Sequence, residues 1–132
     1  MATAQNPLWK ATYPETWVME TEEDSVLLYD PDNGIGTLEI TCFCKDDGPV
    51  EPQELLDLAA DTIEAGARRM DVTMGDKKGL LFFYTEEETA WKEWYLAADN
   101  CVFFITYDCP EELEGAEDDE LVEIIESLQL TG

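Results

Sequence analysis

The chain has 132 residues, 32 of them Asp or Glu, only 7 Lys or Arg and none His, which gives a formal net charge of −25 at pH 7. Such a charge repels phosphates and anionic lipid headgroups, so nucleic acid and anionic membranes are excluded as partners, while basic proteins and cations are attracted. The length suits one domain, which we predict over residues 1–132.

Residues 1–7 contain no positive charge and no apolar run. We predict a loose lead-in here, with no signal peptide, and no apolar run elsewhere is long enough to span a membrane. These features favour a cytoplasmic protein. In that compartment the four cysteines are expected to stay reduced: Cys42, Cys44, Cys101 and Cys109.

The first third of the chain reads as short strands separated by turns. Residues 9–13, 17–20 and 26–29 are strand-like, and each of the first two contains a tryptophan that we expect to pack on the core. The Pro and Asn-Gly of residues 30–36 predict a turn. Residues 37–44 then alternate, which predicts a strand with one buried face.

A helix is predicted over residues 52–65, because Pro52 suits a first helical position and apolar residues recur on one side. That stripe comprises Leu55, Ala59 and Ile63. We expect a strand over residues 69–74, a loop over 75–79 and an apolar central strand over 80–84.

Residues 91–107 are expected to form a hairpin that turns at Asp99 and Asn100, because both types tolerate the positive φ of a short hairpin loop. The expected pairs are Trp94 with Ile105, Leu96 with Phe103, Tyr95 with Phe104 and Ala97 with Val102. Both faces of this hairpin are apolar near the turn, so a layer of structure should cover each face.

The last element is a helix over residues 118–128, with apolar side chains at helical spacing. Those side chains are Leu121, Ile124, Ile125 and Leu128. The predicted fold class is therefore α+β. We expect an α/β/α sandwich, in which helices at about 52–65 and 118–128 cover a central, antiparallel-rich sheet.

Metal and cofactor sites are weakly indicated. Cys42 and Cys44 share one face of a strand, and with Cys101 they could bind a soft metal, but zinc-knuckle spacing and histidine are both missing. Core packing is the favoured role for these cysteines. Residues 30–34 resemble the start of a calcium loop, but Ile35 stands where such a loop needs glycine. We predict no metal site and no cofactor.

The candidate binding residues are one tryptophan and several carboxylates. Trp91 begins a strand beside Glu86, Glu87 and Glu88, where a basic partner could meet a hydrophobic and a charged group together. Glu93 and Asp108 are expected on the same face as Tyr95 and Phe104, where desolvation would raise a carboxyl pKa. The alternatives are ordinary packing for Trp91 and solvent exposure for both carboxylates. No catalytic residue is predicted.

Several segments together match the pattern of a known family: residues 13–17, residues 28–31 leading to 36–40, the first predicted helix, residues 104–107 and residues 126–128. Over most of residues 8–130, this layout resembles the PsbP-like family. Members include an extrinsic photosystem protein, a Ran-binding nuclear import factor and small bacterial proteins. The resemblance implies an α/β/α sandwich that binds other proteins and performs no catalysis. No binding residue of the family can be matched to this chain.

We therefore expect a non-enzymatic cytoplasmic interaction module whose acidic surface engages a basic protein, as an inhibitor or immunity-type partner. One alternative is a small enzyme that works through carboxylates, and the only observation that suggests it is the abundance of these groups. A second alternative is that the acidity reflects adaptation to salt. Oligomeric state is left open.

Overall fold

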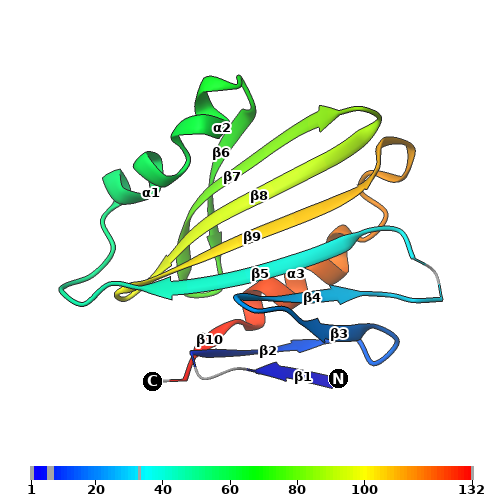
Figure 1. Cartoon of the computed structure of the whole chain (residues 1–132), viewed down its shortest axis with the longest axis horizontal. Coiled ribbons are helices and arrows are strands. Elements are labelled where there is room, and N and C mark those ends of the chain that lie inside the picture. The colour runs from blue at the N-terminus through cyan, green and yellow to red at the C-terminus, as the bar shows by residue number, and fades with distance from the viewer. Residues whose placement is uncertain (1, 6–7, 33, 132) are drawn as a thin grey trace.

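The computed structural model describes residues 2–5, 8–32 and 34–131, which form two antiparallel sheets and a few helices (Figure 1). The larger sheet has seven strands in the order β3-β4-β5-β9-β8-β7-β6. Its strands are β3 (Val18–Thr21), β4 (Ser25–Tyr29), β5 (Thr37–Cys44), β6 (Arg68–Met74), β7 (Lys77–Glu86), β8 (Thr89–Ala98) and β9 (Cys101–Pro110). The protein is thus mostly β, with an α+β character.

The smaller sheet has the order β1-β2-β10 and brings the two ends of the chain together. Its strands are β1 (Ala2–Gln5), β2 (Trp9–Tyr13) and β10 (Gln129–Leu130). The helices are α1 (Pro52–Leu58), α2 (Ala60–Glu64), α3 (Asp118–Ser127) and a short 3₁₀ turn, η1 (Glu111–Leu113). None of the described helices is both long and apolar enough to cross a membrane.

The predicted hairpin is confirmed as β8 and β9, in the expected register. Leu96 pairs with Phe103 and Tyr95 pairs with Phe104 across a loop of Asp99 and Asn100. Asp99 has the positive φ, 52°, that such a loop requires. The hairpin is the centre of the larger sheet, with β5 on one side and β7 on the other.

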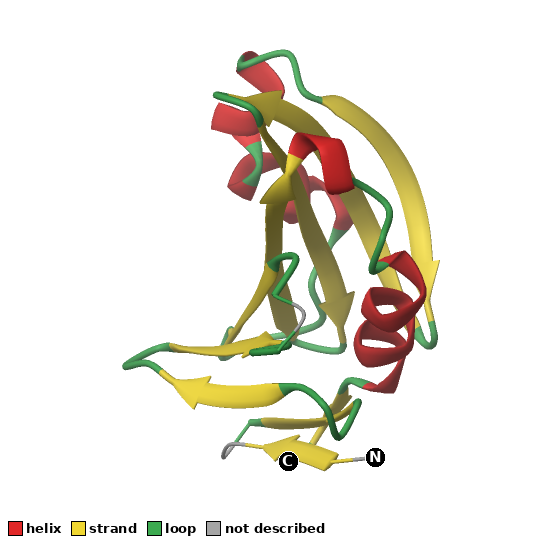
Figure 2. Cartoon of the chain, turned by 90° about the vertical axis from the view of Figure 1, so that its right-hand side faces the viewer, coloured by secondary structure: helices red, strands yellow, loops and turns green. Residues whose placement is uncertain are grey.

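Both faces of the hairpin are covered, as its sequence predicts. On one face, α3, β2 and alternate residues of the larger sheet enclose a core that includes Trp94, Leu96, Phe103 and Ile105. On the other face, α1 packs on a smaller cluster that includes Tyr95. Figure 2 shows the strong curvature of the larger sheet and the small sheet packed at one end of the molecule.

The predicted helix over residues 52–65 is divided. It stops at Ala59, whose ψ of 7° lies outside the helical range, and α2 then begins with Ala60. Glu51 and Glu54 form a capping box at the start of α1, and Pro52 occupies its first turn as expected. The break at Ala59 interrupts the helical spacing, and Ile63 is 39% exposed instead of being buried with Leu55 and Ala59 on the predicted apolar stripe.

Two predicted loops are wrong. The described residues 2–5 of the predicted lead-in form β1, because pairing with β2 buries Ala4 completely. The predicted loop at residues 75–79 is only a two-residue turn, since Met74 pairs with Lys77 and β7 starts there. The expected turn at residues 30–36 includes Asn33, which lies outside the described residues.

Candidate functional site

The loop between β7 and β8 places two glutamates in a conformation that glutamate disfavours. Glu86 pairs with Thr89, so the loop consists of Glu87 and Glu88, whose φ angles are 50° and 66°. Two-residue hairpin loops with both φ angles positive strongly prefer Asn-Gly. A left-handed residue other than glycine costs about 1–3 kcal/mol and is often found where a segment binds a ligand.

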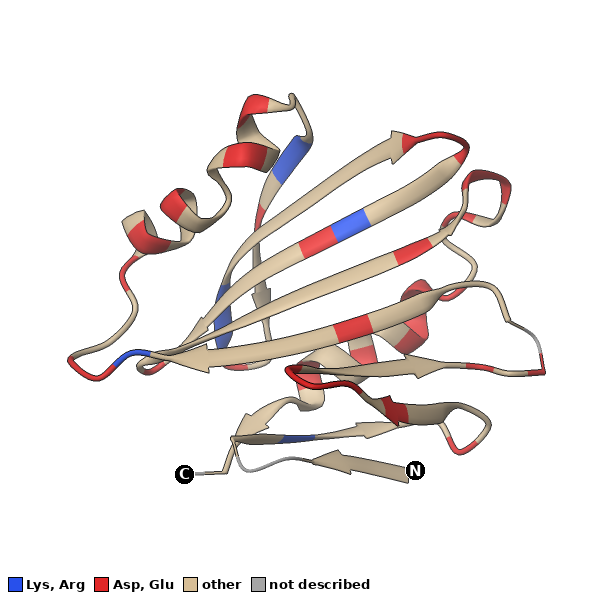
Figure 3. Cartoon of the chain, viewed as in Figure 1, with Lys and Arg blue, Asp and Glu red and all other residues tan. Residues whose placement is uncertain are grey.

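A second acidic loop lies beside this one. The Glu111 N–H donates a hydrogen bond of 2.8 Å to the Glu88 carbonyl, which joins the loop after β9 to the β7–β8 loop. Leu113 is 41% exposed between carboxylates of this second loop. We call the combined surface the acidic end; its members are Glu86, Glu87, Glu88, Glu111, Glu112, Leu113 and Glu114, all exposed. Figure 3 shows this cluster and further carboxylates on the helices and other loops.

Trp91 and Asp108 lie next to the acidic end on neighbouring strands. They are directly paired between β8 and β9. Trp91 is half-buried and stacks on the Tyr84 ring, with 6.3 Å between ring centroids and 13° between ring planes. Burial raises the pKa of Asp108, and the nearby charge of Glu39 adds to that effect. The predicted binding role of these residues remains a proposal.

Glu93 lies on the same face but is occupied by hydrogen bonds. Its carboxylate accepts from the hydroxyls of Tyr84 at 2.6 Å, Thr62 at 2.9 Å and Tyr95 at 3.1 Å. Thr62 belongs to α2, so this network ties α2 to the sheet. A carboxylate with three donors in place is a structural group, and it has little capacity left for a ligand.

A hollow of about 630 Å³ lies between α1 and the edge strand β6. Its apolar lining includes Leu55 and Leu80, and its charged lining comprises Arg69, Asp71, Asp76 and Lys78. Both aspartates are exposed. Sequence reasoning missed this hollow, because only the folded chain places α1 over β7 and β8.

The prediction that all cysteines are reduced is wrong for two of them. Cys44 and Cys101 are directly paired between β5 and β9 and form a disulfide. Cys42 remains a free thiol, and burial raises its pKa to about 11. The predicted core role fits Cys101 and Cys109, which are 4% and 3% exposed, whereas Cys44 is exposed.

The tyrosines in these networks predict how stability changes at high pH. Burial raises the pKa of Tyr95 to about 12 and also raises the pKa values of Tyr84 and Tyr107, next to the carboxylates of Glu93 and Glu117. These tyrosines have a higher pKa in the folded protein than in the unfolded chain, so they stabilise the fold while they stay protonated. Their contribution to the free energy of unfolding is fully present below pH ~10 and is lost as pH rises through about 12.

We therefore expect alkaline unfolding, in which tyrosinate absorbance and loss of circular dichroism rise together above pH ~10, with up to about 1.4 kcal/mol lost per pH unit for each tyrosine. Ionisation of all the tyrosines below pH ~11, with the native spectrum retained, would contradict the burial of these hydroxyls.

Comparison with solved structures concerns the fold. A crystal structure from Bacteroides thetaiotaomicron shares 19% identity with a TM-score of 0.74 and covers 98% of this chain, which spans 48% of that protein. LpqN, involved in cell envelope biogenesis of Mycobacterium tuberculosis, shares 16% identity with a TM-score of 0.54, over 94% of this chain and 83% of LpqN.

The cyanobacterial PsbP protein (CyanoP) of Synechocystis sp. PCC 6803 shares 10% identity with a TM-score of 0.48, over 98% of this chain and 91% of CyanoP. The structures found thus include a PsbP protein, a member of the family that the sequence resembles. At 19% and 16% identity, the likeness to the first two structures is one of fold alone. Neither a protein-family model nor a curated protein matches the sequence.

Proposed function

We propose that the protein is a non-enzymatic interaction module that captures a basic protein at the acidic end, as an inhibitor or immunity-type partner. The supporting observation is the left-handed pair Glu87 and Glu88. Asn-Gly would relieve backbone strain at these positions, so the cost is best explained if the two carboxylates serve a purpose outside the fold.

The electrostatics of the acidic end support this role. Within the described part of the chain, none of its six glutamates forms a salt bridge, so their charges are directed to solvent. Leu113 offers an apolar contact among them. Such a surface accelerates encounter with a basic partner at low salt, and the hydrophobic group adds a contact that salt does not screen.

The enzymatic alternative has less support. The Glu93 carboxylate is already held by hydroxyl donors, and Asp71 and Asp76, which line the hollow beside α1, are both exposed to water. The two buried carboxylates of the described residues, Asp30 and Glu117, interact electrostatically with each other, but neither lines the hollow beside α1. General acid–base catalysis needs carboxylates positioned where a substrate can bind, so binding is the better account.

The proposal also covers the arrangement of helices on the two faces of the larger sheet and the cellular compartment. The apolar clusters on either face of the larger sheet support an α/β/α arrangement, with α1 and α2 on one face and α3 on the other. We also propose a cytoplasmic setting, in which cellular thiols would keep the Cys44–Cys101 pair in exchange between its bonded and reduced forms.

The test separates local from global charge. We expect the double variant Glu87→Asn and Glu88→Gly to bind an Arg- and Lys-rich protein such as cytochrome c roughly 5- to 30-fold more weakly at low salt, because exposed charge pairs contribute about 0.5–1 kcal/mol each. The same variant should be more stable by about 1 kcal/mol, since Asn-Gly suits the loop. Calorimetric titration and urea unfolding measure the two effects.

The matched control is the double variant Asp46→Asn and Asp47→Asn, which removes equal charge from the exposed β5–α1 loop. At about 0.1 M salt it should bind within about twofold of wild type. The ten-residue strand β9 places the β5–α1 loop roughly 33 Å from the acidic end, which is about three Debye lengths. Equal losses in both variants would show that net charge alone governs binding, as the salt-adaptation alternative requires.

A further inference from the structure

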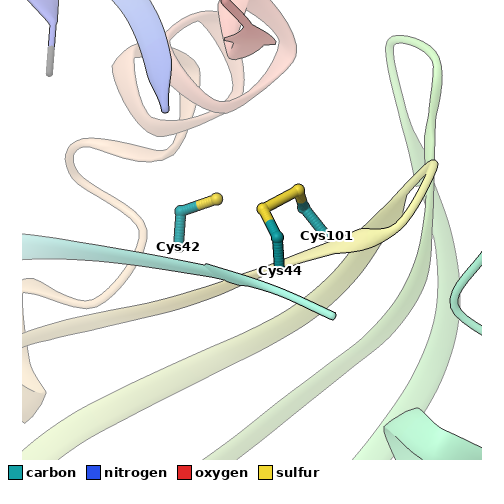
Figure 4. Close-up of side chains that lie close together, drawn as sticks. All are labelled: Cys42, Cys44 and Cys101. Atoms are coloured by element: carbon teal, nitrogen blue, oxygen red, sulfur yellow. A yellow bond between two sulfur atoms is a disulfide. The ribbon is translucent and has the colours of Figure 1, made fainter. Parts of the chain in front are cut away.

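Three cysteine sulfurs meet at one end of the β5–β9 pair. The Sγ atoms of Cys42, Cys44 and Cys101 all lie within 4.8 Å of one another. Cys42 and Cys44 are two residues apart on β5 and therefore share a face, and Cys101 is the direct partner of Cys44 on β9. Figure 4 shows the free thiol of Cys42 directed toward the disulfide.

This spacing suits a metal ion held by three sulfurs. A thiolate-bound zinc-like ion lies about 2.3 Å from each sulfur, which places three coplanar or pyramidal ligands roughly 4 Å apart. The Cys42 sulfur lies within 4.8 Å of each sulfur of the bonded pair. Reduction of the disulfide would let the two sulfurs move apart toward the required separation.

The surroundings favour binding and allow entry. Strands β5 and β9 hold the ligands in register over eight residue pairs, so the site is largely preorganised. Cys42 is half-buried and Cys101 is buried, whereas Cys44 is exposed and gives an ion access. Lys45, next to Cys44, forms a salt bridge of 2.6 Å with Glu54. Its positive charge is therefore balanced by a carboxylate and repels a nearby metal cation less.

We propose that reduction of the Cys44–Cys101 disulfide creates a three-thiolate site, completed by Cys42, for one soft cation of the Zn²⁺ or Cu⁺ class. Two molecules of a cellular monothiol supply the two electrons and two protons that convert the disulfide to two thiols, and they leave as their own disulfide. Binding of the ion then releases one proton from each of the three thiols. A fourth coordination position stays open to water.

This assignment makes the bonded and metal-bound states mutually exclusive. The raised pKa of Cys42 is compatible with the site, because coordination by a metal ion displaces the thiol proton, which is released to solvent. The oxidised protein retains one thiol at the site and should hold the ion poorly. Metal capture would then report the thiol redox state around the protein.

The experiment uses Cd²⁺ as the probe, because its bonds to sulfur give an ultraviolet charge-transfer band that carboxylates do not give. The full chain is reduced with a dithiol, freed of it without air, and titrated with Cd²⁺. We expect one equivalent to produce the band, and Zn²⁺ or Cu⁺ to displace it. Cys42→Ser should weaken binding by at least ~100-fold, since even outer-shell changes weaken metal sites by 10–100-fold.

The control is Cys109→Ser, which removes the cysteine outside the cluster and should leave stoichiometry and affinity unchanged. The oxidised wild type should show no band at one equivalent. Equal binding by Cys42→Ser and wild type would overturn the proposal, as would a band in the oxidised protein. Loss of the near-ultraviolet dichroism on reduction alone would also overturn it, because the site depends on the folded β5–β9 pair.

Discussion

Replacement of Gly79 by alanine is expected to destabilise the protein by about 3 kcal/mol or more, the upper range for overpacking. Gly79 lies in β7 opposite Leu96 of β8. A Cβ atom there would overlap the carbonyl oxygen of Tyr95 and lie 2.9 Å from its carbonyl carbon. Because the obstacle is backbone in the central sheet, rotation of a side chain cannot relieve it.

Urea unfolding of Gly79→Ala beside Gly48→Ala measures this effect. Nothing lies within 4 Å of a Cβ on Gly48, but its φ of 75° makes alanine cost about 1 kcal/mol. The two glycines thus separate steric overlap from backbone strain. Similar losses in the two variants would mean that β7 and β8 are not packed as closely as described.

The second large effect is expected at Lys77, a lysine that is 1% exposed. Its ammonium donates to the carbonyl oxygens of Leu128 at 3.0 Å and Glu126 at 3.4 Å, and so caps the C-terminal end of α3. Asp76 lies 3.5 Å away as the counter-charge. A cation at this end of a helix is favourable, and buried carbonyls without a donor are costly.

We expect Lys77→Met to lower the free energy of unfolding by about 2 kcal/mol, because the lost hydrogen bonds outweigh the relief of burying an ammonium group. Lys78→Met, at the exposed neighbouring position, should stay within about 0.5 kcal/mol of wild type. Thermal and urea unfolding measure both variants. A Lys77→Met protein as stable as wild type would show that desolvation of the ammonium dominates.

The central hairpin could be predicted because its information is local. Residues 91–107 alternate apolar side chains on both faces, and the Asp99-Asn100 pair permits one short loop, so register follows from the turn. The final helix was equally predictable, since Leu121, Ile124 and Ile125 are all buried where the spacing places them. Local pattern and tertiary packing agree in both elements.

Elements that depend on distant partners could not be predicted. Residues 2–5 form a strand by pairing with β2, which in turn pairs with β10 and contacts α3. The sequence predicts a loop at Lys77, but in the fold this side chain is buried against the end of α3, where it contacts Glu126, 49 residues later in the chain. The Cys44–Cys101 bond likewise requires the β5–β9 register, which joins positions 57 residues apart. In each case a long-range contact overrides the local composition.

The candidate site was predictable only where its residues are neighbours in the sequence. Glu86, Glu87, Glu88 and Trp91 stand together in sequence and stay close in the fold. Their proximity to Glu111 depends on the end of β9, which continues past the predicted stop to Pro110. Glu93 carried no sequence signal for its three hydroxyl partners, because one of them comes from α2.

The acidic end is tested most directly by amide hydrogen exchange of the wild type with and without a bound basic protein at low salt. We expect slower exchange in the loops at residues 86–88 and 111–114, with little change in the β5–α1 loop that contains Asp46 and Asp47. Protection spread evenly over every acidic loop, or confined to other parts of the surface, would contradict capture of a basic partner at this end.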